Sequence, residues 1–348
     1  MSHPTQGYAA QSPKTPLAPF KFERREPGPA DVAIDVLFCG ICHSDVHQAR
    51  DEWGGSTFPM VPGHEIVGKV SKVGAKVTRF KQGDMVGLGC FVDSCRSCAS
   101  CKEGLEQFCE GHLVMTYNGT EKDEKTPTQG GYSTHIVADE NYVLKIPASI
   151  SPERAAPLLC AGITTYSPMM HWKIGKGHKL GVIGLGGLGH MAVQIGHAMG
   201  AEITVFSTSR RKEADAKKMG ATHFEILSEG DTAERLAGKY DFLINTVSAN
   251  QDMNQLLGLL KRDGTMILVG APSKPSPISS FSLIMGRRKL GGSLIGGIRE
   301  TQEMLDFCAK HDIGSVVEVI PASKINEAYE RMLRSDVKYR FVIDAATF

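Results

Sequence analysis

The chain has 348 residues, of which 41% are hydrophobic, and its 39 basic and 38 acidic residues give a net charge of +1. This length predicts two domains, and the charge argues against a nucleic-acid-binding or membrane-surface protein, which would carry a strong basic excess. No window holds the roughly 18 consecutive apolar residues that a membrane span needs. The first twenty residues also lack the basic and then apolar regions of a secretory signal, so we expect a cytoplasmic protein.

The first 150 residues alternate short β-rich runs with glycine and proline turns. The clearest runs are VAIDVLF (32–38), EIVGKVSKVG (65–74) and MVGLGCFV (85–92). No long helical pattern separates one run from the next. The pattern therefore predicts an antiparallel, barrel-like domain.

The pattern changes near residue 155. A helix is expected over 155–170, followed by the strand KLGVI (179–183), a glycine turn, a helix over 190–199 and a second strand. Further strands are expected at 242–247 and 265–270, with GGSLIGG (291–297) as a last one. This alternation predicts a parallel, doubly wound sheet. From about residue 298 the chain returns to mixed helix and strand.

The glycine turn fits the pattern G-x-G-x-x-G between a strand and a helix, which is the context of a dinucleotide site. Gly184 permits the tight turn, Gly186 lets a pyrophosphate approach the backbone, and Gly189 allows close packing of helix on strand. The N-terminus of the next helix offers free N–H groups to the phosphates. The alternative is a glycine-rich connector that binds nothing. The whole turn is Gly184, Leu185, Gly186, Gly187, Leu188 and Gly189.

The residues after the second strand favour NADP(H) over NAD(H). An enzyme that uses NAD(H) places an acidic residue there to accept from the ribose 2′-hydroxyl. This chain has hydroxyls and cations instead, which suit a 2′-phosphate. Alternatively, the basic residues simply begin a solvated helix. The segment is Ser207, Thr208, Ser209, Arg210, Arg211 and Lys212, with no acid before Glu213.

Four of the nine cysteines lie within fifteen residues, at Cys95, Cys98, Cys101 and Cys109. In a cytosolic chain this spacing predicts one tetrahedral Zn²⁺ site. Because four thiolates leave no open coordination position, the site should be structural. Disulfides or free thiols are the alternatives.

A second set of metal-binding residue types is scattered over Cys42, His64 and Cys160. Two cysteines and one histidine would leave a fourth position for water or substrate, as catalytic zinc requires. From spacing alone, each residue could equally be a buried packing cysteine or a histidine that satisfies a hydrogen bond. Cys39, Cys90 and Cys308 are interpreted as packing cysteines.

At these motifs the sequence resembles the zinc-dependent medium-chain alcohol dehydrogenases, in particular the cinnamyl alcohol dehydrogenase and broad-specificity aldehyde reductase branch. The similarity extends over nearly the whole chain. It implies a GroES-like catalytic domain formed by residues 1–154 and 297–348, and a Rossmann domain formed by residues 155–296. The segments that carry it include GICHSDVH, EWGGSTFPMVPGHEIVG, GDMVGLGCFVDSC, PLLCAGITTYSP, GLGGLGHM and KYRFVID.

The resemblance implies that Cys42, His64 and Cys160 hold a catalytic zinc ion. Glu65 matches a family residue that can approach the metal. Asp45 matches a carboxylate that orients the zinc-bound histidine, although it could also serve as an acid in the first turn of a helix. Ser44 and His47 match a proton relay that runs through the cofactor ribose, and a histidine suits its outer end because its pKa lies near neutrality.

Cofactor contacts follow from the same resemblance. Thr164, Thr246, Gly270 and the run Ser293, Leu294 and Ile295 match the nicotinamide half of the site. Ser207, Thr208, Ser209, Arg211 and Lys212 match the 2′-phosphate site. Arg340 either reaches the cofactor or ties the domains together.

The expected pocket walls are apolar and partly aromatic, which would favour aromatic or medium-chain aldehydes. They are Trp53, Met60, Cys90, Phe91, Tyr117, Met285 and Leu294. Residues 112–130 form a polar loop with the sequon Asn118-Gly119-Thr120, which we expect to be idle in a cytoplasmic protein.

The sequence thus predicts a zinc-dependent, NADP(H)-using dehydrogenase that interconverts an alcohol and an aldehyde, with two zinc ions per chain and a homodimeric assembly. A zinc-free quinone oxidoreductase on the same fold is one alternative, and the two cysteine sets argue against it. An NADPH-binding redox sensor is another. The sensor is disfavoured because the chain has both Ser44 and His47 and the scattered metal-binding set, which sensing would not need.

Overall fold

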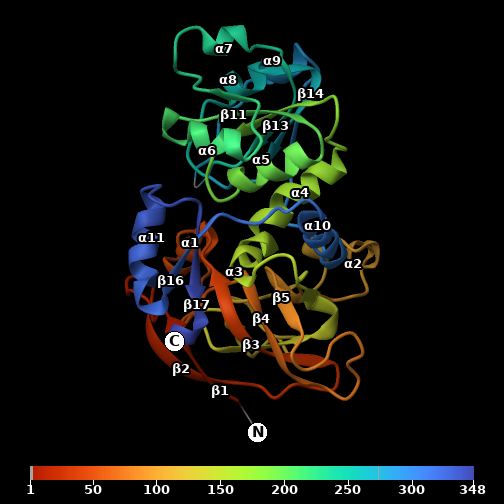
Figure 1. Ribbon diagram of the computed structural model, residues 1–348, viewed down its shortest axis with the longest axis vertical. Helices are drawn as coiled ribbons and strands as arrows, with labels where there is room; N and C mark the ends of the chain where they lie inside the picture. The colour runs from red at the N-terminus through yellow and green to blue at the C-terminus, as the bar shows by residue number, and fades with distance from the viewer. Residues whose placement is uncertain (1–2, 273) are drawn as a thin grey trace. The chain divides into compact units, whose positions relative to one another are not determined.

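The computed structural model describes residues 3–272 and 274–348. The chain divides into two compact units, the first comprising residues up to Ile163 together with Gly296–Phe348, and the second Thr164–Ile295. Each unit has a sheet of its own (Figure 1). The chain passes from the first unit to the second inside helix α4 (Ala161–His171), a few residues after the expected boundary at 154.

The first unit is built around a seven-stranded sheet. The strand order is β16-β17-β3-β4-β5-β9, and β8 also pairs with β3. All of these pairings are antiparallel except that of β16 with β17. Because β17 pairs with β3, the two ends of the chain share one sheet (Figure 1). The strands are β3 (Asp31–Gly40), β4 (Ile66–Val73), β5 (Met85–Leu88), β8 (His135–Asp139), β9 (Leu144–Lys145), β16 (Val317–Pro321) and β17 (Arg340–Asp344).

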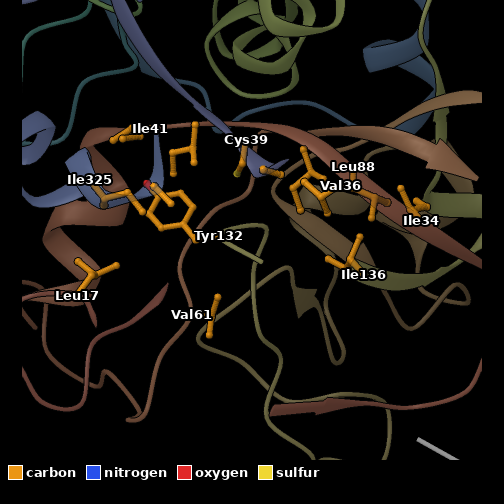
Figure 2. Close-up of a cluster of buried hydrophobic side chains, with 14 of the residues drawn as sticks. Leu17, Ile34, Val36, Cys39, Ile41, Val61, Leu88, Tyr132, Ile136 and Ile325 are labelled. Carbon is orange, nitrogen blue, oxygen red and sulfur yellow. The ribbon is translucent and has the colours of Figure 1, made fainter. Parts of the chain in front are cut away.

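The core of this unit lies against strand β3, where Val32, Ile34 and Val36 are buried at alternate positions. This period of two is what a strand with one buried face requires. Helix α11 (Ile325–Leu333) adds a stripe of apolar residues three and four positions apart, including Ile325 and Tyr329. Figure 2 shows part of this cluster, with Ile325 of α11 beside Ile41, Tyr132 and Leu17.

Shorter elements complete the first unit. Strand β1 pairs with β2, and β6 pairs with β7. These strands are β1 (His3–Ala9), β2 (Ala18–Arg24), β6 (Phe91–Asp93) and β7 (Val114–Met115). The helices are α1 (His43–Ala49), α2 (Ala99–Glu103), α3 (Pro152–Ala155), α10 (Ile298–Lys310) and the 3₁₀ turns η1 (Glu106–Phe108), η2 (Glu140–Tyr142), η3 (Ala156–Leu159), η5 (Ala322–Lys324) and η6 (Ala345–Thr347).

The second unit contains six parallel strands in the order β12-β11-β10-β13-β14-β15. The chain order reverses between β10 and β13, and parallel sheets bind ligands at such a point, outside the carboxyl ends of the strands. The strands are β10 (Lys179–Ile183), β11 (Glu202–Phe206), β12 (His223–Glu225), β13 (Tyr240–Asn245), β14 (Leu260–Leu268) and β15 (Lys289–Gly292). The helices are α5 (Gly189–Ala198), η4 (Arg210–Lys212), α6 (Glu213–Lys218), α7 (Thr232–Arg235), α8 (Met253–Gly258) and α9 (Ser280–Ile284).

The structure interrupts two of the elements that the sequence pattern predicts and shortens a third. The run 85–92 is broken between Leu88 and Phe91, and its halves join different sheets. The expected helix 155–170 is interrupted at Cys160, whose backbone dihedrals (φ −129°, ψ −65°) are not helical. The expected strand 291–297 ends at Gly292. Within residues 3–272 and 274–348, we find no helix with the length and apolar character that crossing a bilayer demands.

Candidate active site

Four metal-binding side chains from separate segments of the first unit lie together. Cys42 immediately precedes α1, His64 and Glu65 precede β4, and Cys160 lies between η3 and α4. One candidate ligand atom from each lies within 4.8 Å of the others, and we call the group the histidine–cysteine cluster. All four residues are at most 8% exposed. The structure therefore brings together Cys42, His64 and Cys160, and with them Glu65, which the resemblance places near the metal.

The thiols of Cys42 and Cys160 shift each other's pKa in opposite directions. A hydrogen bond from the Cys160 thiol is the main cause that holds the pKa of Cys42 well below its ordinary value. The same contact raises the pKa of Cys160. Burial opposes the charged form of His64, but the nearby carboxylate of Asp45 raises its pKa overall. The cluster is thus arranged to stabilise one thiolate in a buried place, which favours the binding of a cation.

Asp45 is fully buried beside this cluster. Its Oδ1 lies 3.1 Å from His64 Nδ1 and accepts from Gly63 N at 3.2 Å. Its Oδ2 accepts from Cys42 N at 2.8 Å and from the Tyr132 hydroxyl at 3.1 Å. A carboxylate only accepts, so Nδ1 of His64 carries hydrogen and Nε2 is left free to bind a metal. Asp45 thus contacts His64 and also lies in the first turn of α1, and Tyr132 is a supporting residue that the sequence did not reveal.

Glu65 pairs with Arg340, whose guanidinium NH2 donates to Oε1. The other carboxylate oxygen, Oε2, is buried and has no partner among the described residues. Burial raises the pKa of Glu65 to about 7 in spite of the arginine. An unpartnered buried oxygen beside two sulfurs and an imidazole matches the donor set of zinc. This arrangement also places Arg340 against Glu65 within the first unit.

The four-cysteine cluster, formed by Cys95, Cys98, Cys101 and Cys109, has its four sulfurs within 4.8 Å of one another. Backbone N–H groups of the same loop point at the sulfurs: Cys98 N lies 3.4 Å from Cys95 Sγ, and Cys101 N lies 3.4 Å from Cys98 Sγ. The N–H groups of Ser97 and Cys98 lower the pKa of Cys95 to about 5. The four sulfurs are therefore placed so that they could hold one metal ion, and no other His, Cys, Asp or Glu of the described residues joins this group.

The expected relay residues lie on α1. Ser44 Oγ is 3.7 Å from Cys42 Sγ, one turn before His47. His47 Nδ1 lies 2.5 Å from the carboxylate of Glu52, and the Trp53 ring stacks on the imidazole at 4.8 Å. Because Glu52 only accepts, Nδ1 carries the hydrogen. The other ring nitrogen, Nε2, is buried and has no partner in the described structure. Glu52 is a second functional residue that the sequence analysis missed, since only the fold of its loop brings it back to His47.

Most expected pocket walls belong to the first unit. Met60, Phe91, Tyr117 and Cys90 are at most 9% exposed. The Tyr117 ring stacks on His64 with centroids 5.8 Å apart. Hydrogen bonding to Cys160 lowers the pKa of Cys90, so this thiol faces the cluster as well as the core. Met285 and Leu294 lie in the second unit, where they are 78% and 52% exposed.

In the second unit, the glycine turn joins β10 to α5 at the point where the strand order reverses. Gly184 has φ +87°, and an added Cβ would lie 2.6 Å from Val247 Cγ2. A Cβ at Gly186 would meet nothing within 4 Å, which leaves the backbone open to a ligand. A Cβ at Gly189 would lie 2.1 Å from Gly184 O. The three glycines therefore match the turn, the open approach and the close packing expected of a pyrophosphate site.

The hydroxyl and cationic segment follows β11 in the same unit. Lys212 Nζ donates to Leu185 O at 3.0 Å, so this side chain lies against the glycine turn. Arg210 is engaged by Glu213 and Glu229, whereas no ion pair within the described chain engages Arg211, which is exposed. Ser207 N donates to Glu225 O in the neighbouring strand. The segment thus places Lys212 against the turn and leaves Arg211 exposed, whereas Arg210 is paired with Glu213 and Glu229.

The remaining cofactor candidates occupy the carboxyl ends of neighbouring strands. Thr246 Oγ1 donates to Ile183 O at 2.7 Å, and Ser293 N donates to Leu268 O. A cavity of about 430 Å³ opens at these strand ends, with Val247 and Gly270 in its lining. Thr164 is buried on α4, and Leu294 and Ile295 end the unit. Gly270 is the residue of the expected nicotinamide half that lines this cavity.

Comparison with known proteins agrees with both units. Residues 28–148 match the model of the alcohol dehydrogenase GroES-like domain, and residues 187–310 match that of the zinc-binding dehydrogenases. The chain is 56% identical over 341 residues to NADP-dependent alcohol dehydrogenase C 1 of Mycolicibacterium smegmatis, covering 98% of this chain and 97% of that protein. The chain belongs to the zinc-binding alcohol dehydrogenase family.

Other members of this family are similar along their full length. The aldehyde reductase YahK of Escherichia coli is 54% identical, with 97% of each chain covered. The CAD of Helicobacter pylori, solved in complex with NADP(H), has a TM-score of 0.94 and 45% identity over 99% of both chains. A cinnamyl alcohol dehydrogenase of Sorghum bicolor has a TM-score of 0.95 and 44% identity, covering 99% of this chain and 98% of that one. The predicted family and fold are confirmed.

Proposed function

We propose that the protein interconverts an alcohol and an aldehyde by hydride transfer with NADP(H), using one catalytic and one structural zinc ion. The histidine–cysteine cluster is the observation that carries this proposal. Two sulfurs and an imidazole meet in a buried place, and Asp45 fixes the imidazole tautomer. Zn²⁺ held there by Cys42, His64 and Cys160 supplies Lewis-acid polarisation of the substrate oxygen. The four-cysteine cluster holds the structural ion.

The residues of α1 handle the proton. Ser44 offers a hydroxyl 3.7 Å from Cys42 Sγ. His47 keeps its Nδ1 hydrogen toward Glu52, so Nε2 is the atom that takes up or releases a proton. The side chain of Glu52 is 42% exposed. Its negative charge stabilises the positively charged imidazolium form of His47 while the ring carries the extra proton.

The pocket walls support aromatic or medium-chain aldehydes as substrates. Tyr117 lies over His64, and Met60 and Phe91 add buried apolar surface in the same unit. Apolar walls with few polar groups discriminate against small hydrophilic substrates because such substrates lose water without gaining partners. The names of the relatives, an aldehyde reductase and cinnamyl alcohol dehydrogenases, agree with this substrate class.

Zinc content and cofactor choice test the function together. The purified protein should contain about two zinc ions per chain and oxidise NADPH with an aromatic aldehyde. The double exchange of Arg211 and Lys212 for serine should raise the Kd for NADPH at least tenfold and that for NADH less than threefold, because only NADPH carries the 2′-phosphate. A zinc-free protein would point to a quinone reductase. Equal effects on the two cofactors would contradict the 2′-phosphate site.

We also propose that the protein is a cytoplasmic homodimer. Strand β15 is an edge strand, since it pairs only with β14 in the described sheet. Helix α9 and the residue after it expose Phe281, Ile284 and Met285 by 67–78%. An edge strand beside exposed apolar residues suits a second copy of the chain. None of the nine cysteines forms a disulfide in the described structure, which suits a reducing compartment. Light scattering should give twice the chain mass of 37.6 kDa, and Phe281→Lys should lower it.

A further inference from the structure

Asn118, the first residue of the otherwise unexplained sequon, binds two segments of the first unit through its side chain. Its Oδ1 accepts from Thr57 N at 2.8 Å, and its Nδ2 donates to Gln48 Oε1 at 2.6 Å. The residue is half-buried, and its φ of +53° lies in the left-handed region that asparagine adopts more readily than most residues. Both functional groups of the amide are therefore committed to residues outside its own loop.

The two partners of Asn118 belong to the proton relay region. Gln48 directly follows His47 on α1. Thr57 lies a few residues after Glu52 and Trp53 in the same segment, and both of those residues contact the His47 ring. Ser56 Oγ also donates to Gln48 O at 2.8 Å, which closes this segment onto the helix. The amide of Asn118 thus reaches the loop that holds Glu52 in place.

On its other side, Asn118 is bonded directly to Tyr117, which stacks on His64. The residue before Tyr117 has anchors of its own: Thr116 Oγ1 donates to Gly89 O at 2.5 Å, and Thr116 N donates to Cys90 O at 3.1 Å. Tyr117 is consequently held through both of its neighbours in the chain. Thr116 is bonded to Gly89 and Cys90, and Asn118 is bonded to the segment from Glu52 to Thr57, which we call the relay loop. Tyr117 itself is only 7% exposed, and the chain beyond it forms a polar hairpin between Gly119 and Thr128.

We propose that Asn118 is a positioning residue for catalysis, which ties the substrate wall at Tyr117 to the relay loop at Glu52 and Trp53. This inference rests on the proposed function and names a determinant of substrate choice within it. The nitrogen that would carry a glycan in a sequon is the Nδ2 bound to Gln48. The sequence Asn118-Gly119-Thr120 therefore serves the pocket, and its match to a glycosylation signal is incidental.

Three variants separate the side-chain bonds from backbone strain and from general stability. Asn118→Gly removes both hydrogen bonds but tolerates the positive φ. Asn118→Asp keeps the acceptor for Thr57 N. Asn326→Ala is the matched control, because Asn326 makes the same pair of bonds to the backbone of Leu17, at 3.0 and 2.9 Å. The control also lies in the first unit.

Steady-state kinetics with NADPH is the first measurement. Asn118→Gly should lower kcat/KM for cinnamaldehyde about tenfold and that for acetaldehyde less than threefold, since a displaced wall harms the substrate that touches it. Asn118→Asp should recover part of the loss, and Asn326→Ala should change neither value. Unchanged kinetics in Asn118→Gly, or an equal loss for both aldehydes, would overturn the proposal.

Hydrogen exchange gives a second measurement that needs no turnover. In Asn118→Gly, peptides that contain Thr57 should exchange faster than in the parent protein, because the N–H of Thr57 loses its acceptor. Asn326→Ala should leave these peptides unchanged. Equal exchange rates in all three proteins would refute the contact and the proposal with it. A parent protein that exchanges as expected but shows no aldehyde reduction would instead count against the proposed function.

Discussion

The two cysteine-containing clusters of the first unit are assembled in opposite ways. The four-cysteine cluster comes from one loop of fifteen residues, and backbone N–H groups of that loop bind its sulfurs. The histidine–cysteine cluster comes from three segments that span residues 42 to 160, and side chains remote in sequence support it. Asp45, Tyr132 and Arg340 are examples of that support.

This difference indicates different tasks. A loop whose own backbone surrounds four sulfurs closes the coordination sphere and ties down local chain. A cluster held by the sheet and by buried carboxylates keeps its geometry without using every donor position, which leaves room for chemistry. The predictions below test whether activity depends on one cluster and stability on the other, and they run from the largest expected loss of turnover to the smallest.

The largest loss is expected for Cys160→Ala. Removal of one of three ligands should lower kcat/KM by about 10³-fold or more, because several kcal/mol of charge stabilisation are lost. The melting temperature should change by only a few degrees, since Cys160 lies at a break between two helical turns. Enzyme assays, elemental analysis and thermal unfolding measure these effects. Retained activity would show that the histidine–cysteine cluster is not catalytic.

A smaller loss is expected for Asp45→Asn, which keeps the shape of the side chain but turns one acceptor into a donor. The affinity of the histidine–cysteine cluster for zinc should fall about 10- to 100-fold, with activity falling in parallel at limiting zinc. Competition with a chelator measures the affinity. Asp93→Asn, next to the four-cysteine cluster, is the control and should leave activity intact. If both variants behave alike, the proposed orientation of His64 by Asp45 is wrong.

The smallest loss of turnover is expected for Cys98→Ser. Its main effect should be on stability, because the loop 95–109 loses the metal ion that cross-links it. The melting temperature should fall by more than about 5 °C, and the protein should contain one zinc ion fewer per chain. Activity per folded molecule at low temperature should remain within about twofold of the parent value. An unchanged melting temperature would contradict a structural role, and a large loss of kcat in folded protein would contradict the division of tasks.

Much of this organisation could be predicted from the sequence because its signals are local. The four cysteines, the glycine turn and the hydroxyl and cationic segment each lie within one short stretch of chain. A strand, a turn and a helix in succession define a dinucleotide site without reference to the remainder of the fold. The family resemblance is confirmed by relatives that match almost the whole chain.

The sequence alone could not show the contacts that depend on long-range packing. Tyr132 reaches Asp45, Arg340 pairs with Glu65, and Asn118 binds Gln48 and Thr57. Hydrogen bonds between residues tens or hundreds of positions apart have no periodic pattern. The break at Cys160 was likewise hidden, since an apolar run is compatible with a continuous helix.

The sequence by itself determined the fold class, the glycine turn and the four-cysteine cluster, because each follows from residue types at short, fixed spacing. Only the tertiary structure decided how Cys42, His64 and Cys160 meet, and which buried residues surround them. The physical reason is that a site assembled from distant segments takes its geometry from the sheet beneath it. Strands β3 and β17, from opposite ends of the chain, pair in that sheet and carry Arg340 to Glu65.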